Sequence, residues 1–187
     1  IIGVGDIGDR YTVQRGLGEF QEELKKARAA VSWVRPEQVH LTVKFLGSVA
    51  SDQLDPIRQS LARVVEGASP LRLQPAGCGA FPTVHNMRVV WLGLDGDLDR
   101  LAELAGVVEA ALVPLGFKAE GRPFRPHLTL GRVKGKQNLR VLQQILLART
   151  DIRAEAFDVD KLVLYKSDLR PEGARYTPLF HAAFGSQ

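Results

Sequence analysis

The tripeptide His-Leu-Thr occurs twice in this chain, in "HLTVKFLG" at residues 40–47 and in "HLTLGRVKG" at residues 127–135. The chain has only four histidines among 187 residues, and two of them open this motif. Thr and the apolar residues that follow favour β-strands. A loop with Arg and Pro precedes each copy, "RPEQVH" and "RPFRPH". The copies lie 87 residues apart, which predicts one such strand in each half of the chain.

The rest of the chain alternates between strand and helix patterns. Apolar residues recur at helical spacing in four segments, namely residues 17–27, 52–66, 97–112 and 138–148. Strand patterns cover residues 1–7, 31–34, 38–47, 70–82, 87–94, 127–133, 156–169 and 174–184. Several connections are short, such as the turn "TVHN" at residues 83–86. Short connections favour antiparallel pairing, so the pattern predicts an α+β fold rather than a doubly wound parallel sheet.

Strand alternation assigns the motif residues to opposite faces. His40 and Thr42 share one face, as do His127 and Thr129, while the leucine between each pair points to the core. Two such strands side by side would bring two imidazoles and two hydroxyls together. An imidazole can give or take a proton near neutral pH. In-line phosphoryl transfer can use a base on one side of phosphorus and an acid on the other. The pattern therefore predicts a metal-free phosphodiesterase.

A metal site is the competing interpretation of the paired histidines. Such a site needs further His, Cys or carboxylate ligands. Neither motif contains an Asp or Glu, so the pattern favours acid–base catalysis and no cofactor.

The chain resembles the 2H phosphoesterases, and specifically the RNA 2′,3′-cyclic phosphodiesterases, also called 2′-5′ RNA ligases. The resemblance covers almost the whole chain and rests on "HLTVKFLG", "RPFRPHLTLGR", "GAFP" before "MRVVWLGL", and "LYKSDLRPEGARYTPL". It implies one domain over residues 1–187 with two interleaved, pseudo-symmetric lobes. Each lobe would hold an antiparallel sheet flanked by helices, with the catalytic cleft between the lobes.

The resemblance also implies an activity. The family opens the 2′,3′-cyclic phosphate of RNA ends to leave a 2′-phosphate, and it can join such an end to a 5′-hydroxyl. His40, Thr42, His127 and Thr129 carry over as catalytic residues, and Arg132 carries over as a substrate contact. We favour His40 as the proton donor and His127 as the proton acceptor, although the near-symmetric motifs leave this division open.

Three further residues are candidate substrate contacts. Lys44 shares the face of His40 by alternation, so it either contacts phosphate or is a solvated lysine. Phe45 falls on the opposite face, which favours core packing, with a substrate contact as the alternative where the strand ends. Tyr176 either lies near the cleft or packs as a core aromatic.

The composition of the chain indicates which kinds of partner it can bind. The net charge of +4 permits RNA binding, so the alternative function is a non-catalytic module that binds RNA ends, with bases stacked on Trp33, Phe81 or Trp91. A pair of titrating histidines favours catalysis over binding alone.

The single cysteine, Cys78, fits a reducing cytoplasm and a packing role. No apolar run reaches the roughly 18 residues of a membrane span.

One motif and two histidines are not expected to take part in catalysis, and the sequence does not identify the physiological substrate. "GVGDIG" at residues 3–8 matches a dinucleotide-binding fingerprint, but only two residues precede it, so the required strand is missing. His85 and His181 are expected at the surface or in packing. We expect a monomer. The physiological substrate stays open between tRNA halves, other cleaved RNA ends and small cyclic nucleotides.

Overall fold

A computed structural model describes residues 2–4, 10–170 and 173–185. Within these ranges the α-helices are α1 (Arg10–Lys25), α2 (Leu54–Glu66), α3 (Leu98–Leu112) and α4 (Leu139–Ala148). The strands are β1 (Ile2–Val4), β2 (Val31–Trp33), β3 (Leu41–Lys44), β4 (Leu71–Thr83), β5 (Asn86–Gly96), β6 (Leu128–Val133), β7 (Phe157–Val159), β8 (Lys161–Arg170) and β9 (Gly173–Ala183). Short 3₁₀ turns cover Pro36–Gln38, Ser51–Gln53 and Val113–Leu115.

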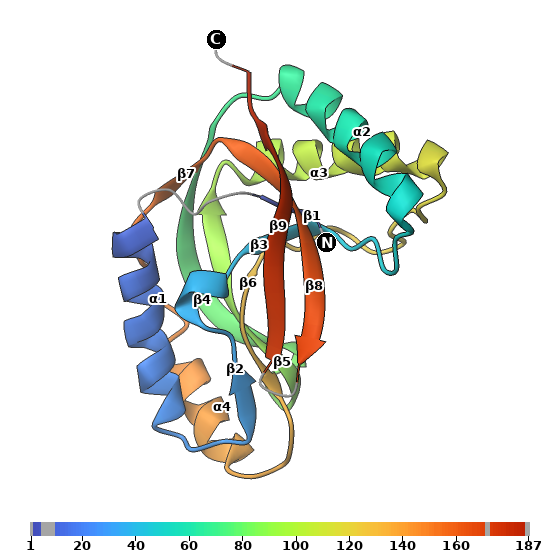
Figure 1. The fold of residues 1–187 in the computed structure, drawn as a ribbon. Helices are drawn as coiled ribbons and strands as arrows, with labels where there is room; N and C mark the ends of the chain where they lie inside the picture. The colour runs from blue at the N-terminus through green and yellow to red at the C-terminus, as the bar shows by residue number, and fades with distance from the viewer. Residues whose placement is uncertain (1, 5–9, 171–172, 186–187) are drawn as a thin grey trace.

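The strands form one curled antiparallel sheet with the order β7-β4-β5-β6-β3-β1-β8-β9, and β2 pairs with β6 (Figure 1). The motif strands β3 and β6 are neighbours at the middle of this order. They pair through Leu41 and Leu128, the central leucines of the two motifs. Along this path four strands lie to each side of the junction, counting β3 and β6 themselves, and β2 is a fifth strand on the β6 side. The predicted α+β class with antiparallel pairing is confirmed.

The helices pack as two pairs, and α3 contacts β4 as well as β3. Helices α2 and α3 pack together, with α2 against β8 and β9 and α3 against β3, while α1 packs with α4 and α4 contacts β4. The two pairs occupy opposite ends of the molecule (Figure 1). The result is two lobes that meet at the β3–β6 junction. That the lobes are duplicated copies within one domain stays a prediction.

The predicted helical stripes form the core because their apolar residues recur on one face. In α1 the residues Leu17, Phe20 and Leu24 are at most 4% exposed, and in α2 Ile57 and Leu61 are fully buried. Both motif leucines, Leu41 and Leu128, are at most 1% exposed. The alternation predicted for these leucines is therefore confirmed.

The structure differs from the expectation in two strand regions. The single strand expected over residues 156–169 is two strands, because the chain breaks at Asp160, whose carbonyl accepts a hydrogen bond from the Phe184 amide at 2.7 Å. The strand expected over residues 38–47 spans only Leu41–Lys44, so His40 lies just before it. Most of "GVGDIG" lies outside the described residues, although its first two residues belong to β1.

The β3–β6 junction should carry much of the stability. We expect Leu128→Ala to lower the free energy of unfolding by about 2–5 kcal/mol, because it opens a cavity where the two lobes join. The measurement is urea denaturation, with Leu147→Ala as the control because Leu147 is 50% exposed on α4. Equal stability of the two variants would contradict the central role of this pair.

Candidate active site

A cleft of about 1700 Å³ crosses the middle of the sheet. Its lining includes all four predicted catalytic residues, His40, Thr42, His127 and Thr129. The antiparallel junction of β3 and β6 explains the convergence, since the leucines pair toward the core and the flanking residues face the other side. Two segments 87 residues apart in sequence thus contribute to one cleft.

Both imidazoles are anchored in the same way. The His40 Nδ1 lies 2.9 Å from the carbonyl oxygen of Gln38, and the His127 Nδ1 lies 2.7 Å from that of Arg125. A carbonyl only accepts hydrogen bonds, so each Nδ1 must carry the hydrogen. Each Nε2 is then the atom that can take up or release a proton. The loop before each motif strand fixes the tautomer with its own backbone.

Aromatic rings hold each imidazole from the side. The His40 ring lies edge-on to Tyr176, with ring centroids 4.3 Å apart, and 5.5 Å from Tyr165. The His127 ring lies edge-on to Phe81 at 4.9 Å. Tyr176 is half-buried and lines the cleft, so it is a cleft residue rather than a core aromatic. Sequence reasoning did not identify Tyr165 or Phe81 as neighbours of the histidines, because both contacts depend on long-range strand pairing.

The surroundings of His40 disfavour its charged form. Burial of the ring lowers the pKa of His40 below its ordinary value of 6.5, and the positive charge of Arg132 acts in the same direction, while the bond to Gln38 opposes them. Arg132 lies on β6, faces the cleft and is exposed. The predicted substrate contact is thus in a position to influence the catalytic histidine.

The cleft is strongly cationic. Its lining has two carboxylates, Glu109 and Glu120, against eight basic side chains, namely Arg35, Lys44, Arg88, Arg122, Arg125, Arg132, Lys134 and Arg175. Lys44 and Arg122 pair with those two carboxylates. The other six form no ion pair with any carboxylate in the described part of the chain. A surface of unpaired cations attracts an anionic ligand.

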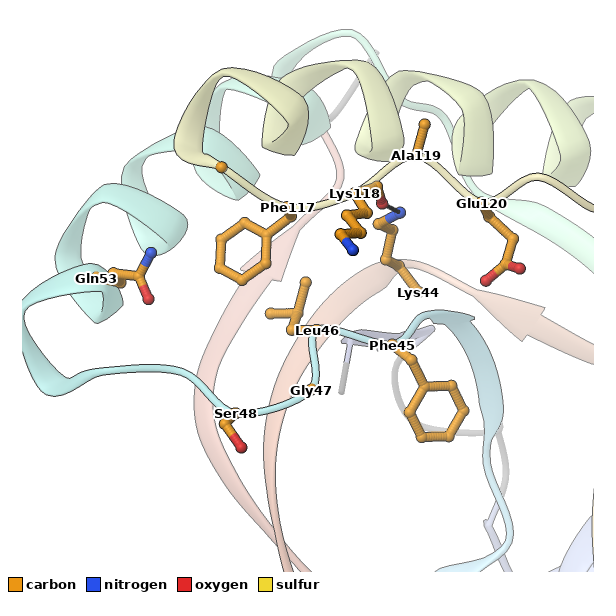
Figure 2. Close-up of a pocket in the computed structure, with 11 residues that line it drawn as sticks. Lys44, Phe45, Leu46, Gly47, Ser48, Gln53, Phe117, Lys118, Ala119 and Glu120 are labelled. Atoms are coloured by element: carbon orange, nitrogen blue, oxygen red, sulfur yellow. Dashed lines mark hydrogen bonds between the residues drawn. The ribbon is translucent and has the colours of Figure 1, made fainter.

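Lys44 is neither solvated nor aimed at open solvent. It is 7% exposed, and its Nζ donates to Glu109 Oε2 at 3.3 Å. The Nζ also donates to the Lys118 carbonyl at 2.7 Å, and Figure 2 shows Lys44 beside Lys118. The other oxygen of Glu109 accepts a hydrogen bond from the Glu120 amide at 2.9 Å. Two of the three ammonium donors are therefore used within the protein. This Lys44 clamp ties β3 to α3 and to the segment that leads to the second motif.

Core packing of Phe45 is a wrong expectation. The Phe45 side chain is 58% exposed and lines the cleft, whereas Leu46 beside it is buried. Strand β3 ends at Lys44, and the chain turns at Gly47, which has a φ of +70°. Val43 and Lys44 are both buried, so the alternation breaks at the end of the strand, and Phe45 takes the outward position while Leu46 takes the inward one.

The remaining polar candidates lie apart from the cleft. The Cys78 thiol donates weakly to backbone carbonyls of Leu146 and Arg149, and burial raises its pKa to about 11, which fits packing rather than nucleophilic chemistry. His85 lies in the β4–β5 turn 2.8 Å from Gln143 Nε2, and His181 is exposed on β9.

The described residues include no cluster of three or more His, Cys, Asp and Glu side chains that could hold a metal ion. Among the helices in the described ranges, none has the length and apolarity needed to cross a bilayer.

The fold is that of the 2H phosphoesterase class. It is antiparallel, and each half of the sheet contributes one His-x-Thr motif to a common cleft. A family model described as the 2′-5′ RNA ligase superfamily matches residues 13–171, and the chain belongs to this superfamily.

Individual relatives agree with this assignment. The RNA 2′,3′-cyclic phosphodiesterase of Methanothermobacter thermautotrophicus is 33% identical over 163 residues, which is 87% of this chain and 88% of that protein. The fold is similar to that of TT0787 of Thermus thermophilus, with a TM-score of 0.79, 24% identity and coverage of 100% and 97% of the two chains. It is also similar to E. coli LigT complexed with 3′-AMP, with a TM-score of 0.76, 22% identity and coverage of 99% and 97%.

The Lys44 clamp gives an asymmetric prediction for stability. Glu109→Ala leaves a buried ammonium with only one acceptor, so we expect a loss of about 2–4 kcal/mol in the free energy of unfolding. Lys44→Met removes the buried charge and keeps the volume, and the partner Glu109 retains some solvent, so the expected loss is about 1 kcal/mol or less. Chemical denaturation measures both, and a greater loss in Lys44→Met would refute the clamp.

Arg132 should add a smaller contribution to the effect of burial on the titration of His40. Arg132→Gln removes a positive charge that disfavours the imidazolium, so the pKa of His40 should rise. Arg132→Lys keeps the charge and should leave the pKa nearly unchanged. The measurement is an NMR titration of the imidazole signals in all three proteins. An unchanged or lower pKa in Arg132→Gln would show that the guanidinium does not act on His40.

Proposed function

We propose that this protein hydrolyses the 2′,3′-cyclic phosphate at RNA ends and leaves a 2′-phosphate. The observation that carries the proposal is the pair of motif histidines in one cleft, each with its Nδ1 anchored to a carbonyl and its Nε2 available for proton transfer. The relative from Methanothermobacter thermautotrophicus is named for this activity. The cationic cleft supports an anionic substrate of the same kind.

The reaction divides between the two sides of the phosphorus atom. The His127 Nε2 takes a proton from water while the water oxygen forms a bond to phosphorus. The bond from phosphorus to the 3′-oxygen breaks in line, and the His40 Nε2 gives its proton to that oxygen. Hydroxyl groups of Thr42 and Thr129 donate hydrogen bonds to the non-bridging oxygens. The product is a 2′-phosphate with a free 3′-hydroxyl.

The division of labour is compatible with the environment of His40. Burial lowers its pKa, so the imidazolium is a stronger proton donor than an exposed histidine would be. The phosphate anion of the substrate favours the protonated form while it is bound, which compensates for the burial. His40 as donor and His127 as acceptor is therefore the assignment we propose.

The same chemistry permits ligation. If a 5′-hydroxyl of a second RNA takes the place of water, the attack joins the two RNAs through a 2′-5′ linkage. Water is far more concentrated, so ligation requires that the protein hold the second end in place. RNA ends such as tRNA halves and small cyclic nucleotides both fit the chemistry. A monomeric state and a cytoplasmic location are part of the proposal.

The test uses an oligonucleotide that ends in a 2′,3′-cyclic phosphate. We expect His40→Ala and His127→Ala each to lower the rate by roughly 10²–10⁴-fold, because each removes one proton-transfer group, while EDTA has no effect. His85→Ala is the matched control, since His85 lies in a turn outside the cleft. The readout is the rate, with the position of the product phosphate identified.

Three results would overturn the proposal. Full activity of either single variant would exclude paired acid–base catalysis, and loss of activity on chelation would exclude the metal-free mechanism. Binding of the RNA end by the wild-type protein without turnover would instead support the non-catalytic module.

A further inference from the structure

Gln21 is a polar side chain that lies in the core and not in the cleft. It is fully buried on α1, one turn from Leu17 and from Leu24, which are also fully buried. It is not among the residues that line the cleft. An amide loses its hydrogen bonds to water when it is buried, which costs free energy unless protein groups replace them. The partners of Gln21 therefore indicate its role.

The Gln21 amide donates two hydrogen bonds to backbone carbonyls outside its own helix. Its Nε2 lies 2.7 Å from the carbonyl oxygen of Val34 and 3.0 Å from that of Leu130. The oxygen of the same amide, Oε1, is buried and has no hydrogen-bond partner within the described ranges. The contribution of this polar side chain therefore comes from its two donors.

The two carbonyls mark the point where the chain leaves the edge of β6. Strand β2 pairs with β6 and ends one residue before Val34, and β3 resumes the pairing at Leu41. After β2 the Val34 amide still donates to the Leu130 carbonyl at 2.9 Å. Residues 35–40 then lie outside both strands. Gln21 therefore holds the chain at the place where it departs from the sheet.

The segment that departs carries the anchor of His40. A 3₁₀ turn over Pro36–Gln38 closes the segment, and the Gln38 amide donates to the Arg35 carbonyl at 2.8 Å. The Gln38 carbonyl is the acceptor for the His40 Nδ1. Because the turn is bonded within itself, its position relative to β6 depends on where the chain leaves the sheet and where it rejoins it.

Leu130 gives the same amide a connection to the second motif. It directly follows Thr129, which lines the cleft together with His40. Adjacent residues share a planar peptide unit, so a shift of the Leu130 backbone moves that of Thr129 with it. One buried side chain is therefore bonded to the backbone close to a catalytic residue of each motif.

We propose that Gln21 is a positioning residue for the phosphodiesterase reaction, and that its two donated hydrogen bonds set the placement of His40 and Thr129 in the cleft. The inference rests on the proposed function, because it assigns a role within that reaction. Gln21 acts through the backbone and does not contact the substrate. Without its donors the segment before His40 can shift against β6, and a misplacement of about 1 Å is enough to lower a rate by about 100-fold.

The experiment compares four proteins on a nucleoside 2′,3′-cyclic phosphate, namely the wild type, Gln21→Met, Gln21→Asn and Leu24→Ala. Methionine fills a similar space without a donor, and asparagine keeps the amide on a shorter stem, which weakens both bonds. Leu24→Ala is the matched control, because it destabilises the core one turn away on α1 without removing a hydrogen bond. A thermal melt reports the stability of each protein, and Gln21→Asn carries the comparison if Gln21→Met does not fold.

We expect Gln21→Met to lower kcat by roughly 10- to 100-fold and to change KM by less than about threefold, because acid–base groups act in the transition state. Gln21→Asn should show a smaller loss of kcat. Leu24→Ala should lower the melting temperature by about 4–20 °C and keep kcat within about twofold of the wild type.

A second measurement reports on His40 without any substrate. At about pH 8.5, well above the ordinary pKa of histidine, an NMR correlation between ring nitrogens and ring protons distinguishes the two neutral tautomers. His40 of the wild type should show the Nδ1–H form that the Gln38 carbonyl requires. In Gln21→Met it should show a mixture of both forms. His127, whose anchor is the Arg125 carbonyl, should keep the Nδ1–H form in both proteins.

Three outcomes would overturn this inference or the proposed function. A wild-type kcat in Gln21→Met refutes the positioning role. An equal loss of kcat in Leu24→Ala at equal stability refutes it as well, because the effect is then general destabilisation. If the wild type does not turn over the substrate, the proposed function fails, and the tautomers of His40 in Gln21→Met still decide whether Gln21 holds the segment before it.

Discussion

The pairing of β3 with β6 is the constraint on which the rest of the molecule depends. Leu41 and Leu128 face one another across this junction and are almost completely buried. Because the side chains of a strand alternate, burying these two leucines turns the residues on either side of them toward the cleft. The hydrophobic contact that joins the lobes is therefore also what positions His40 and His127.

The hydrogen bonds of the two histidines show how much of the site is set by residues that are neighbours in sequence. Each Nδ1 donates to the carbonyl two residues earlier, although the loop sequences "RPEQVH" and "RPFRPH" differ. The difference between the two sites comes from outside the motifs. His40 lies against two tyrosine rings, Tyr165 and Tyr176, whereas His127 lies against Phe81. Non-local strands thus give two locally similar groups different environments, which is a physical basis for different roles.

Sequence reasoning succeeded where periodicity decides the outcome. The buried leucines of the motifs, the stripes of α1 and α2 and the β4–β5 hairpin all follow from repeats of 2 or 3.6 residues. It failed where a strand ends or where the partner is far away in sequence. The buried pairing of Lys44 with Glu109 joins residues 65 positions apart, and no local pattern predicts it. The break at Asp160 likewise depends on a contact with Phe184.

The end of β3 shows why sequence-based predictions fail for residues beside the cleft. Three consecutive residues have three different surroundings: Lys44 is buried against Glu109, Phe45 is exposed in the cleft and Leu46 is buried in the core. Continued alternation would have kept Phe45 on the buried face with Leu41 and Val43 and turned Lys44 and Leu46 toward the cleft. Ending the strand at the clamp lets both neighbours be buried in different surroundings, so the exposed ring is held without packing of its own. The Lys44 clamp also contacts residues 118–120, which precede the second motif, so hydrogen bonds to Lys44 and Glu109 join the end of β3 to this segment.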